Sequence, residues 1–452
     1  MILQRQIYEK LTLWKEECRG TKALLIEGAR RIGKSTICEE FGKHAYRSYL
    51  LIDFAVAPDE IKSYFEKYLH DLDTFFMLLS TYYRVSLFPR ESLIIFDEIQ
   101  LFPKAREAIK YLVKDGRYDY IETGSLISIR ENIKNILIPS EERHIKMYPL
   151  NFEEFCDALG EGAIIGYIHS CFQKSEPLEK SLHEKAMLLF RQYMLVGGMP
   201  QSVVAYVENQ KDFAAADREK RDILNLYRND IMKIEARYRT RVLSIYDQIP
   251  GFLSRHEKRV VFKDLRDGSN AEQYEDTFFW LADSMIANEC FLCNDPQVGL
   301  SVNESRGYVK CYLGDTGLLI SHAFDENELL EADVYKQILH DEININEGMF
   351  YENVIAQMLV ANGHKLYFYT RYSAEKHRND IEIDFLISNN SKLQYKLYPI
   401  EVKSGNRYSA TSLKRFQEKY ADRIGTSYII HPHNLSFKED IICIPPYMTI
   451  CL

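Results

Sequence analysis

A glycine-rich segment near the amino terminus has the residue types and spacing of a phosphate-binding loop. It runs Gly28-Ala-Arg-Arg-Ile-Gly33-Lys34-Ser35. In this pattern glycines let backbone N–H groups wrap phosphate oxygens, a lysine reaches the β- and γ-phosphates, and a hydroxyl ligates Mg²⁺. The alternative is an accidental turn, but the strand–loop–helix setting favours a site for ATP and Mg²⁺. Its expected members are Gly28, Arg31, Gly33, Lys34, Ser35 and Thr36, with Ser35 as a metal ligand.

Two carboxylates follow an apolar run 63 positions after Lys34. Leu93-Ile-Ile-Phe96 leads directly into Asp97 and Glu98, which indicates a buried strand that ends in two acids. Taken alone, such a sequence is usually a strand that reaches solvent. After a phosphate-binding loop, the first acid holds Mg²⁺ and the second polarises the attacking water. We therefore predict that Asp97 helps to hold the metal and that Glu98 is the general base of ATP hydrolysis.

Two further segments offer groups that could contact a nucleotide. The apolar run Tyr118–Ile121 precedes Glu122-Thr-Gly-Ser125, where the hydroxyl of Thr123 or Ser125 could sense the γ-phosphate or cap a helix. Downstream, Val196-Gly-Gly-Met-Pro200 interrupts a helical stretch. Its proline could pack against an adenine ring, or the segment could be a helix stop followed by Pro. Composition does not choose between these alternatives.

Acidic residues and a lysine recur near the carboxyl terminus. Apolar and polar residues alternate from Ile381 to Ile387, the period of a half-buried strand, and this places Asp384 opposite the apolar face. A second strand, Leu397–Val402, is followed by Lys403, which shares a face with Glu401. Together with a glutamate in an upstream helical segment, these residues resemble the core of PD-(D/E)XK nucleases.

In such a core, acidic oxygens hold Mg²⁺ beside the scissile phosphate and a lysine positions the nucleophilic water. A Glu-x-Lys sequence also occurs on exposed strand edges, where it only blunts aggregation, and the neighbouring acids Asp380 and Glu382 suit a solvated strand end. We predict that the group converges around one divalent metal, with Asp384 and Glu401 as ligands. The expected catalytic residues are Glu352, Asp384, Glu401 and Lys403.

The elements that must position these residues follow an α/β order in the first third of the chain. Short apolar runs alternate with helix-favouring segments, which predicts a parallel sheet covered by helices. Strand signals nearly vanish between residues 151 and 233 and return from residue 308. We therefore expect an α/β protein with four domains: a P-loop ATPase core at 1–150, a helical lid at 151–235, a winged-helix-like domain at 236–305 and an α/β nuclease-like domain at 306–452.

The winged-helix expectation depends on two short helices around a glycine-containing turn. Residues 260–265 lead to Gly268-Ser-Asn270 and a second helical run, and residues 291–293 and 301–303 could form the wing. The second helix is acidic, the wrong sign for a helix in the DNA major groove. The segment therefore fits the docking of a protein better than the recognition of DNA. A nucleic acid and a regulatory protein both remain candidate partners. The acids are Glu272, Glu275, Asp276 and Asp283.

The composition excludes several classes of protein. With 452 residues, 46% hydrophobic and 27% charged, the chain is neither a disulfide-held mini-protein nor a largely disordered one. A formal net charge of −9 argues against a polybasic protein that coats nucleic acid. We find no signal peptide and no apolar run long enough to span a membrane. We expect a cytoplasmic protein with no membrane partner, whose nine scattered cysteines are reduced.

Taken in order, the motifs resemble those of a known family, the prokaryotic AAA-type ATPases that carry a C-terminal domain of unknown function, DUF4143. The resemblance covers nearly the whole chain and implies Mg²⁺-dependent ATP hydrolysis. In the related STAND ATPases a Gly-x-Pro of the lid contacts the nucleotide base, which implies that role for Gly198 and Pro200. The motifs are Gly28–Ser35, Asp97–Gln100, Glu122–Ser125, Tyr148–Phe155 and Gly197–Pro200.

The resemblance also implies a homo-oligomer, because members of this family frequently assemble. In an oligomer Arg106 or Arg117 could reach a neighbour's γ-phosphate, although each could equally be a solvated helix charge. Two functional classes remain open. In the first, ATP turnover controls phosphodiester cleavage by the last domain. In the second, a regulatory ATPase carries a catalytically inactive domain that binds protein or nucleic acid.

Overall fold

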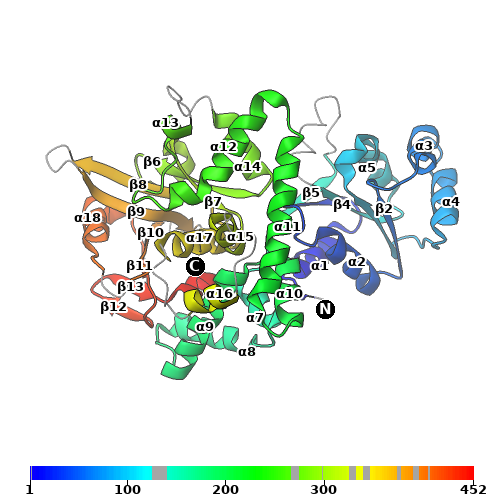
Figure 1. Cartoon of the computed structure of the whole chain (residues 1–452). Coiled ribbons are helices and arrows are strands. Elements are labelled where there is room, and N and C mark those ends of the chain that lie inside the picture. Colours follow the sequence, from blue (N-terminus) through cyan, green and yellow to red (C-terminus); the bar gives the residue numbers. More distant parts are fainter. Residues whose placement is uncertain are drawn as a thin grey trace. The chain divides into compact units, whose positions relative to one another are not determined.

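The computed structural model describes residues 1, 3–124, 140–265, 274–297, 299–324, 332–339, 347–373, 378–389, 396–405 and 408–452. They belong to two units, one of Gln4–Tyr148 and one of Met1–Leu3 with Pro149–Leu452. Figure 1 colours the first unit blue to cyan and most of the second green to red. Among the described helices, none is both long and apolar enough to cross a membrane.

The first unit contains a parallel sheet of five strands in the order β2-β3-β4-β1-β5. The expected α/β fold is confirmed. Every residue of β1, β3 and β4 is buried, as strands covered on both faces require. The strands are β1 (Ala23–Glu27), β2 (Ser48–Asp53), β3 (Ser92–Asp97), β4 (Asp119–Gly124) and β5 (Glu142–Lys146). The helices are α1 (Ile7–Cys18), α2 (Lys34–Ala45), α3 (Asp59–Lys67), α4 (Leu72–Tyr83), α5 (Pro103–Asp115) and the short η1 (Ile99–Leu101).

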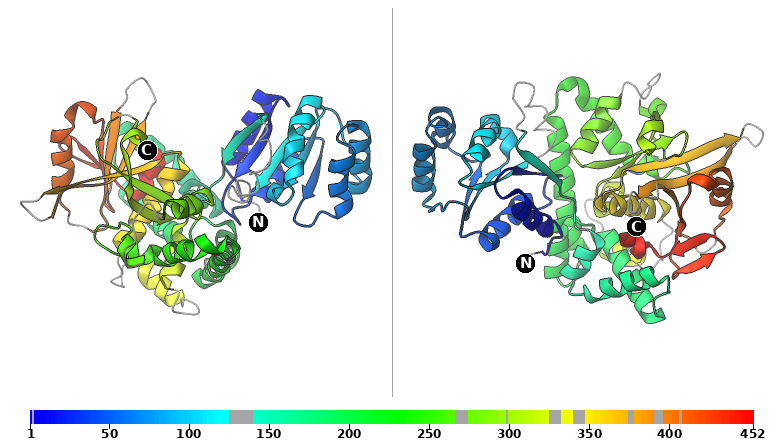
Figure 2. Two further views of the ribbon diagram at one scale, coloured as in Figure 1. Left: turned by 90° about the horizontal axis from the view of Figure 1, so that it is seen from above. Right: turned by 180° about the vertical axis from the view of Figure 1, so that it is seen from behind.

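Helices lie on both faces of this sheet (Figure 2). On one face α3, α4 and α5 pack around an aromatic cluster that includes Phe54, Phe65, Phe75 and Phe96. On the other face α2 contacts β2, β3 and β4, and α1 packs against α2. Full burial of one such aromatic side chain contributes about 1.5–3 kcal/mol. The cluster therefore fixes the sheet on which the motif-bearing turns depend.

The strand order brings three turns of the chain to one edge of the sheet. β4 lies between β1 and β3, because Ile121 pairs with Leu24 on one side and with Ile95 on the other. The carboxyl ends of parallel strands meet at the same edge, where ligands of open α/β sheets bind. The segments that follow Glu27 and Asp97 therefore lie near each other, with the end of β4 between them.

In the second unit, residues 152–232 are helical, as the loss of strand signals predicts. Local signals set the helix ends: Asn151 and Glu154 form a capping box at the first helix, and Asp212 caps the last. The helices are α7 (Phe152–Ala158), α8 (Ala163–Lys174), α9 (Lys180–Val196), α10 (Pro200–Glu208) and α11 (Phe213–Met232). Further helices are α12 (Ala236–Leu253), α13 (Phe262–Leu265), α14 (Glu275–Asp283), α15 (Thr316–Ala323), α16 (Ala332–Leu339), α17 (Glu347–Ala361) and α18 (Thr411–Lys419).

A mixed sheet of eight strands in the order β12-β13-β11-β10-β9-β8-β6-β7 completes this unit. Helix α17 contacts β6, β7, β8 and β10, and α18 contacts β9. The strands are β6 (Ala287–Cys293), β7 (Glu304–Leu313), β8 (Leu366–Ser373), β9 (Arg378–Asn389), β10 (Lys396–Val402), β11 (Ser427–Ile430), β12 (Ser436–Lys438) and β13 (Ile441–Ile444). Short turns of 3-10 helix are η4 (Leu300–Asn303), η6 (Ala421–Arg423) and η7 (Pro446–Cys451).

Of the two segments expected as a wing, residues 291–293 belong to β6 of this larger sheet, whereas residues 301–303 lie in the 3-10 helix η4 and not in a strand. β6 and β7 form an antiparallel hairpin after α12, α13 and α14, but β6 also pairs in parallel with β8 through Cys290 and Leu366. The domain boundary that we expected at 305/306 falls inside β7. The expected turn at 268–270 lies outside the described residues. Hydrogen bonding thus joins the middle segment to the C-terminal strands in one sheet.

Candidate functional site

The glycine-rich segment forms the turn between β1 and α2. Gly33 has φ 91° and immediately precedes Lys34, the first residue of α2. A side chain at Gly28 has no room, because a Cβ there would lie 2.6 Å from the carbonyl oxygen of Met147. Arg31 is exposed at φ 68°, while Ser35 and Thr36 lie in the first turn of α2, beside Lys34. The backbone is therefore shaped for phosphate oxygens at a helix N-terminus.

The side chain of Lys34 turns back into this loop. Its ammonium donates hydrogen bonds to the carbonyl oxygens of Gly28 at 3.0 Å and Ala29 at 2.9 Å. Burial lowers the pKa of Lys34, and the nearby carboxylates of Glu98 and Asp97 partly oppose that effect. A phosphate group at the loop would give this buried ammonium anionic partners that the two carbonyls do not supply.

Asp97 and Thr123 meet at the carboxyl ends of β3 and β4. Both side chains are buried, and the hydroxyl of Thr123 donates a hydrogen bond to Oδ1 of Asp97. The next residue, Glu98, has a left-handed backbone with φ 52°, and the amide of Gln100 donates to its carboxylate. Ser125, the alternative to Thr123, lies outside the described residues.

Arg5 supports the loop from a distant part of the sequence. Its guanidinium donates to the carbonyl oxygens of Ile32 at 2.9 Å and Tyr148 at 2.7 Å. These partners lie 27 and 143 positions away, so no local pattern predicts the contacts. Gln100, by contrast, lies only two positions from Glu98, so the Asp97–Gln100 motif could have indicated that contact.

Gly198 and Pro200 form a tight connection between α9 and α10 in the second unit. The N–H of Gly198 donates to Oδ2 of Asp315 at 2.6 Å, and a Cβ at Gly198 would lie 2.1 Å from the carbonyl oxygen of Leu150. Pro200 begins α10, the position where proline is best tolerated. The helix stop followed by Pro is therefore present, and close packing requires its glycine.

In the C-terminal part, the structure brings Asp384, Glu401 and Lys403 together. β9 and β10 are antiparallel, with Phe385 opposite Ile400, so the next pair along the ladder is Asp384 and Glu401, whose side chains share a face. Oδ2 of Asp384 accepts from the N–H of Val402 at 2.9 Å. Lys403 Nζ lies 3.0 Å from Oε2 of Glu401.

The carboxyl group of Glu401 is almost completely enclosed. Only 1% of this residue is exposed, and its Oε1 has no hydrogen-bond partner among the described residues. Burial raises the pKa of Glu401 to about 7, the carboxylate of Asp384 adds to the rise, and Lys403 opposes it.

Glu352 from α17 joins the same group and is surrounded by cations. Lys310 Nζ lies 2.9 Å from its Oε1 and 3.6 Å from Oδ1 of Asp384. Lys258 forms an ion pair with Oε2, and the hydroxyl of Tyr312 donates to Oε1. Burial alone would raise the pKa of Glu352, but the charges of Lys310 and Lys258 outweigh it and lower the pKa to about 2.

We did not predict the roles of Lys258 and Lys310 from the sequence. Lys258 lies in a mixed, charged segment without any distinguishing pattern. Lys310 does leave a signal, because it is the one charged residue in the run Val309–Leu313 of β7, all of which is buried. A lysine inside a buried strand needs a carboxylate partner.

Three family models match the chain. Residues 20–156 match an AAA domain, residues 187–328 match DUF8612 and residues 347–448 match DUF4143, the last two being domains of unknown function. The chain carries an AAA domain and a DUF4143 domain. The AAA domain holds the glycine-rich loop, Asp97 and Glu98, and the DUF4143 domain holds the carboxylates from Glu352 onward. No curated protein matches the chain.

Similar solved structures include three with low scores. A structure of C. elegans PCH-2 is 9% identical, with TM-score 0.27, over 47% of this chain and 67% of that chain. A structure titled for katanin self-assembly is 14% identical, with TM-score 0.25, over 49% and 71%. Cdc6p from Pyrobaculum aerophilum is 11% identical, with TM-score 0.26, over 75% and 94%. Such TM-scores say nothing about the activity of this chain.

Arg106 of the AAA domain is not placed to reach a neighbouring subunit. Its guanidinium is buried and donates to both carboxylate oxygens of Glu142, at 3.0 and 2.7 Å. Arg117 is partly exposed, bonds Asp115 and Asp73 at 2.7 Å, and lies 4.9 Å from the ring centre of Phe76. Of the two arginines, only Arg117 remains a candidate for action in trans.

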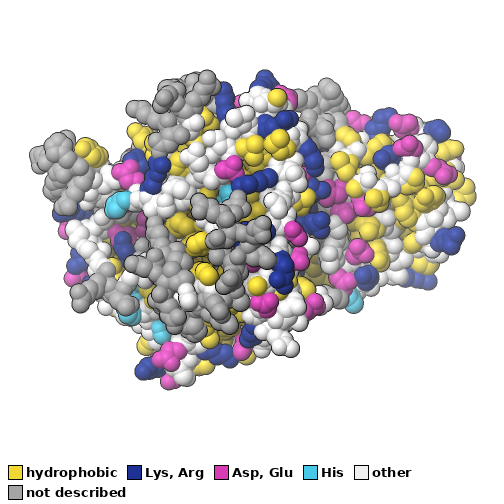
Figure 3. Space-filling model, in the orientation of Figure 1, with side chains coloured by type: hydrophobic (Ala, Val, Ile, Leu, Met, Phe, Trp, Pro, Cys, Tyr) yellow, Lys and Arg dark blue, Asp and Glu magenta, His cyan; other side chains and the backbone are white. Residues whose placement is uncertain are grey.

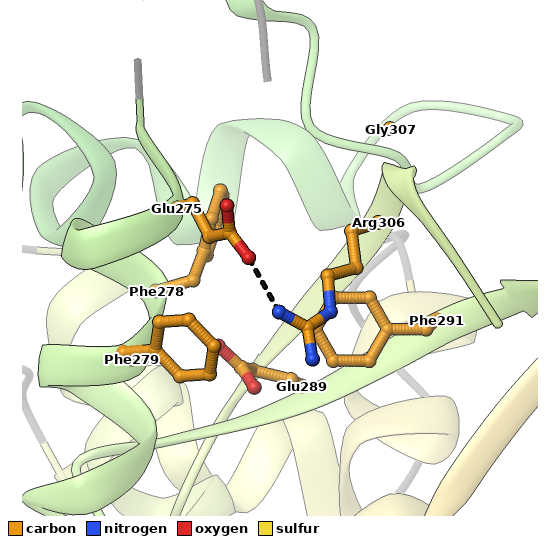
Figure 4. Close-up of a pocket in the computed structure, with 7 residues that line it drawn as sticks. All are labelled: Glu275, Phe278, Phe279, Glu289, Phe291, Arg306 and Gly307. Atoms are coloured by element: carbon orange, nitrogen blue, oxygen red, sulfur yellow. Dashed lines mark hydrogen bonds and ion pairs between the residues drawn. The ribbon is translucent and has the colours of Figure 1, made fainter. Parts of the chain in front are cut away.

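A pocket of about 270 Å³ lies between α14, β6 and β7 (Figure 4). Phe278, Phe279 and Phe291 line it together with Arg306, whose guanidinium pairs with Glu275 and lies 5.3 Å from the ring centre of Phe279. None of the predicted site residues lines this pocket. On the face seen in Figure 3, acidic and basic side chains are intermixed over the described surface, unlike a basic nucleic-acid groove.

Proposed function

We propose that this protein is an ATP-hydrolysing, Mg²⁺-dependent switch of the AAA type. The observation that carries the proposal is the meeting of three groups at one edge of the parallel sheet. These are the loop with Lys34, the buried pair Asp97–Thr123, and Glu98 beside that pair. The match of residues 20–156 to an AAA domain supports the same conclusion.

Each residue has a separate task in this proposal. The loop N–H groups between Gly28 and Gly33 bind phosphate oxygens, and Lys34 exchanges its carbonyl partners for the β- and γ-phosphates. Thr123 orients Asp97 through their hydrogen bond. Glu98 accepts a proton from the attacking water, and its contact with Gln100 sets where that carboxylate points.

The donor set at this edge fits a magnesium ion. A hydroxyl oxygen and a carboxylate oxygen are ligands that Mg²⁺ takes together with nucleotide phosphates, and Ser35 and Asp97 would hold it here. When bound, Mg²⁺ would neutralise charge on the β- and γ-phosphate oxygens. The buried Asp97, fixed by Thr123, offers an oxygen without rearrangement of the strand.

Replacing Lys34 by Ala tests nucleotide binding. Loss of a charged hydrogen-bonding group should weaken ATP binding by about 10- to 100-fold, measured by calorimetry with Mg²⁺ and a non-hydrolysable ATP analogue. Lys43→Ala is the matched control, because Lys43 lies on the same helix but is exposed and pairs only with Glu40 on the surface. Equal affinity in both variants would remove Lys34 from the site.

We also propose that Gly198 and Pro200 contact the nucleotide base. The resemblance to STAND ATPases supports this role. Pro200→Ala keeps the helix start but removes the ring. This variant should weaken the binding of the ATP analogue and the binding of free triphosphate to different extents. Equal effects on the two affinities would contradict a base contact.

We further propose that hydrolysis depends on assembly, with Arg117 acting on a neighbouring subunit. Specific activity should then rise with protein concentration over the range where light scattering shows monomers becoming oligomers. Arg117→Ala should assemble normally but lose most of that rise, since an arginine finger stabilises the charge of the transition state. A flat activity across this range would count against any arginine in trans.

Of the two functional classes, we favour a regulatory ATPase whose DUF4143 domain does not cleave nucleic acid. The convergence of Asp384, Glu401 and Lys403 supports a nuclease-like arrangement. A metal fits poorly there, however, since Lys310 Nζ already lies against Glu352 and Asp384. Incubation with plasmid and with single-stranded nucleic acid, in Mg²⁺ or Mn²⁺ and with or without ATP, separates the two classes.

A further inference from the structure

The ammonium of Lys310 lies where the carboxylates of the DUF4143 domain converge. Only 1% of its side chain is exposed, and it stands 2.9 Å from Glu352 Oε1 and 3.6 Å from Asp384 Oδ1. The centre of the Phe368 ring lies 5.3 Å from Nζ of Lys310. A buried lysine is costly unless opposite charges compensate it, so these carboxylates and this lysine stabilise one another.

We propose that Lys310 takes the place of a divalent cation in this cluster, which is therefore closed to metal ions. This inference rests on the proposed non-cleaving role of the DUF4143 domain. It explains why that domain would not cleave nucleic acid. Mg²⁺ or Ca²⁺ would need carboxylate oxygens at about 2.0–2.6 Å. An ammonium in contact with both Glu352 and Asp384 excludes such an ion between them by its volume and by its charge.

The balance of charge in the cluster supports this substitution. Three lysines, Lys258, Lys310 and Lys403, face three carboxylates, those of Glu352, Asp384 and Glu401, in ion pairs. Acids gathered without compensation would attract a metal, but this group already has its counter-charges.

Two of the three lysines come from a different matched segment than the carboxylates. Lys258 and Lys310 belong to the part that matches DUF8612, residues 187–328, whereas the carboxylates belong to the DUF4143 domain, residues 347–448. The strand that carries Lys310, β7, is hydrogen-bonded to β6, which pairs with β8 of the second segment. The DUF8612 segment thus supplies the two lysines that pair with Glu352, while Lys403 of the DUF4143 segment pairs with Glu401.

Mn²⁺ binding to the whole chain tests the substitution. An Asp97→Asn background, chelator-treated and free of nucleotide, removes the carboxylate from the two expected metal ligands of the AAA domain, Ser35 and Asp97. In that background the chain should bind no Mn²⁺ tightly, as read from the electron paramagnetic resonance of free Mn²⁺. Lys310→Met, an unbranched side chain one atom shorter and without charge, should gain one Mn²⁺ per chain, and a further Asp384→Asn change should abolish the gain.

Two controls keep the test decisive. Lys365→Met removes an exposed lysine that pairs with Glu304 and should gain no Mn²⁺. Lys310→Gln retains a hydrogen-bond donor to Glu352 and serves if Lys310→Met does not fold. The inference is overturned if the Lys310-containing chain already binds Mn²⁺ that Asp384→Asn abolishes, or if a folded Lys310 variant gains none. Because no ATP is used, these outcomes are independent of whether the AAA domain hydrolyses it.

Discussion

Glu98→Gln should bind ATP with nearly unchanged affinity and hydrolyse it about 10²- to 10⁴-fold more slowly. Glutamine keeps the size and polarity of the side chain but cannot accept a proton from water. Lys34 and Asp97, which we assign to phosphate and metal, remain in place. The carboxamide oxygen of the new glutamine can still accept from the amide of Gln100, and this contact does not touch the loop that binds phosphate.

Single-turnover hydrolysis and equilibrium binding separate the two effects in this variant. After gel filtration, Glu98→Gln should retain unhydrolysed ATP, whereas the unmodified chain should retain ADP or nothing. Glu91→Gln is the matched control, because Glu91 is exposed before β3 and pairs with Arg47 on the surface. Undiminished turnover in Glu98→Gln would show that another group is the base.

The sheet of the AAA domain could be predicted from its sequence except for one strand. β1, β3 and β4 read as apolar runs because both faces of the sheet are covered. β5 was missed, since Glu142-Arg-His-Ile-Lys146 looks like a polar loop. It is a strand because its backbone pairs with β1 and its polar side chains meet Arg106 and Glu27. Those partners are distant in sequence, so no local pattern indicates them.

The C-terminal cluster could also be predicted only in part. Alternation along β9 predicts the face of Asp384, and the Glu-x-Lys spacing predicts that Glu401 and Lys403 point together. Neither pattern contains Lys258 or Lys310, which lie 94 and 42 positions from Glu352. From the sequence we therefore predicted the acids and Lys403 but not the two lysines that pair with Glu352, and the chemistry of the cluster depends on all of them.

Arg106→Met should destabilise the AAA domain by about 3–5 kcal/mol, the usual cost of removing one partner of a buried ion pair. Arg106 neutralises Glu142, with Glu122 and Glu27 also near it. Methionine fills a similar volume but removes the guanidinium from Glu142, which keeps His144, 3.4 Å from its Oε2, as a partner. An arginine that acted in trans on a neighbour's nucleotide would instead be dispensable for the fold of its own domain.

The free energy of unfolding of this domain can be followed through Trp14. The chain has two tryptophans, so Trp280→Phe leaves Trp14, which is 1% exposed and donates to the carbonyl of Lys22, as a fluorescent reporter of the first unit. In this background Arg47→Met, at an exposed pair with Glu91, should cost at most about 1 kcal/mol.

A second change distinguishes a lost ion pair from lost packing. Arg106→Met combined with Glu142→Met should recover most of the stability, because apolar side chains of similar volume often replace a buried ion pair without loss. If the loss of packing around the guanidinium were the cause of the destabilisation, Glu142→Met would lower the free energy of unfolding further. If Arg106→Met instead costs no more than Arg47→Met, the pair with Glu142 does not hold the domain together, and Arg106 becomes available again for a role between subunits.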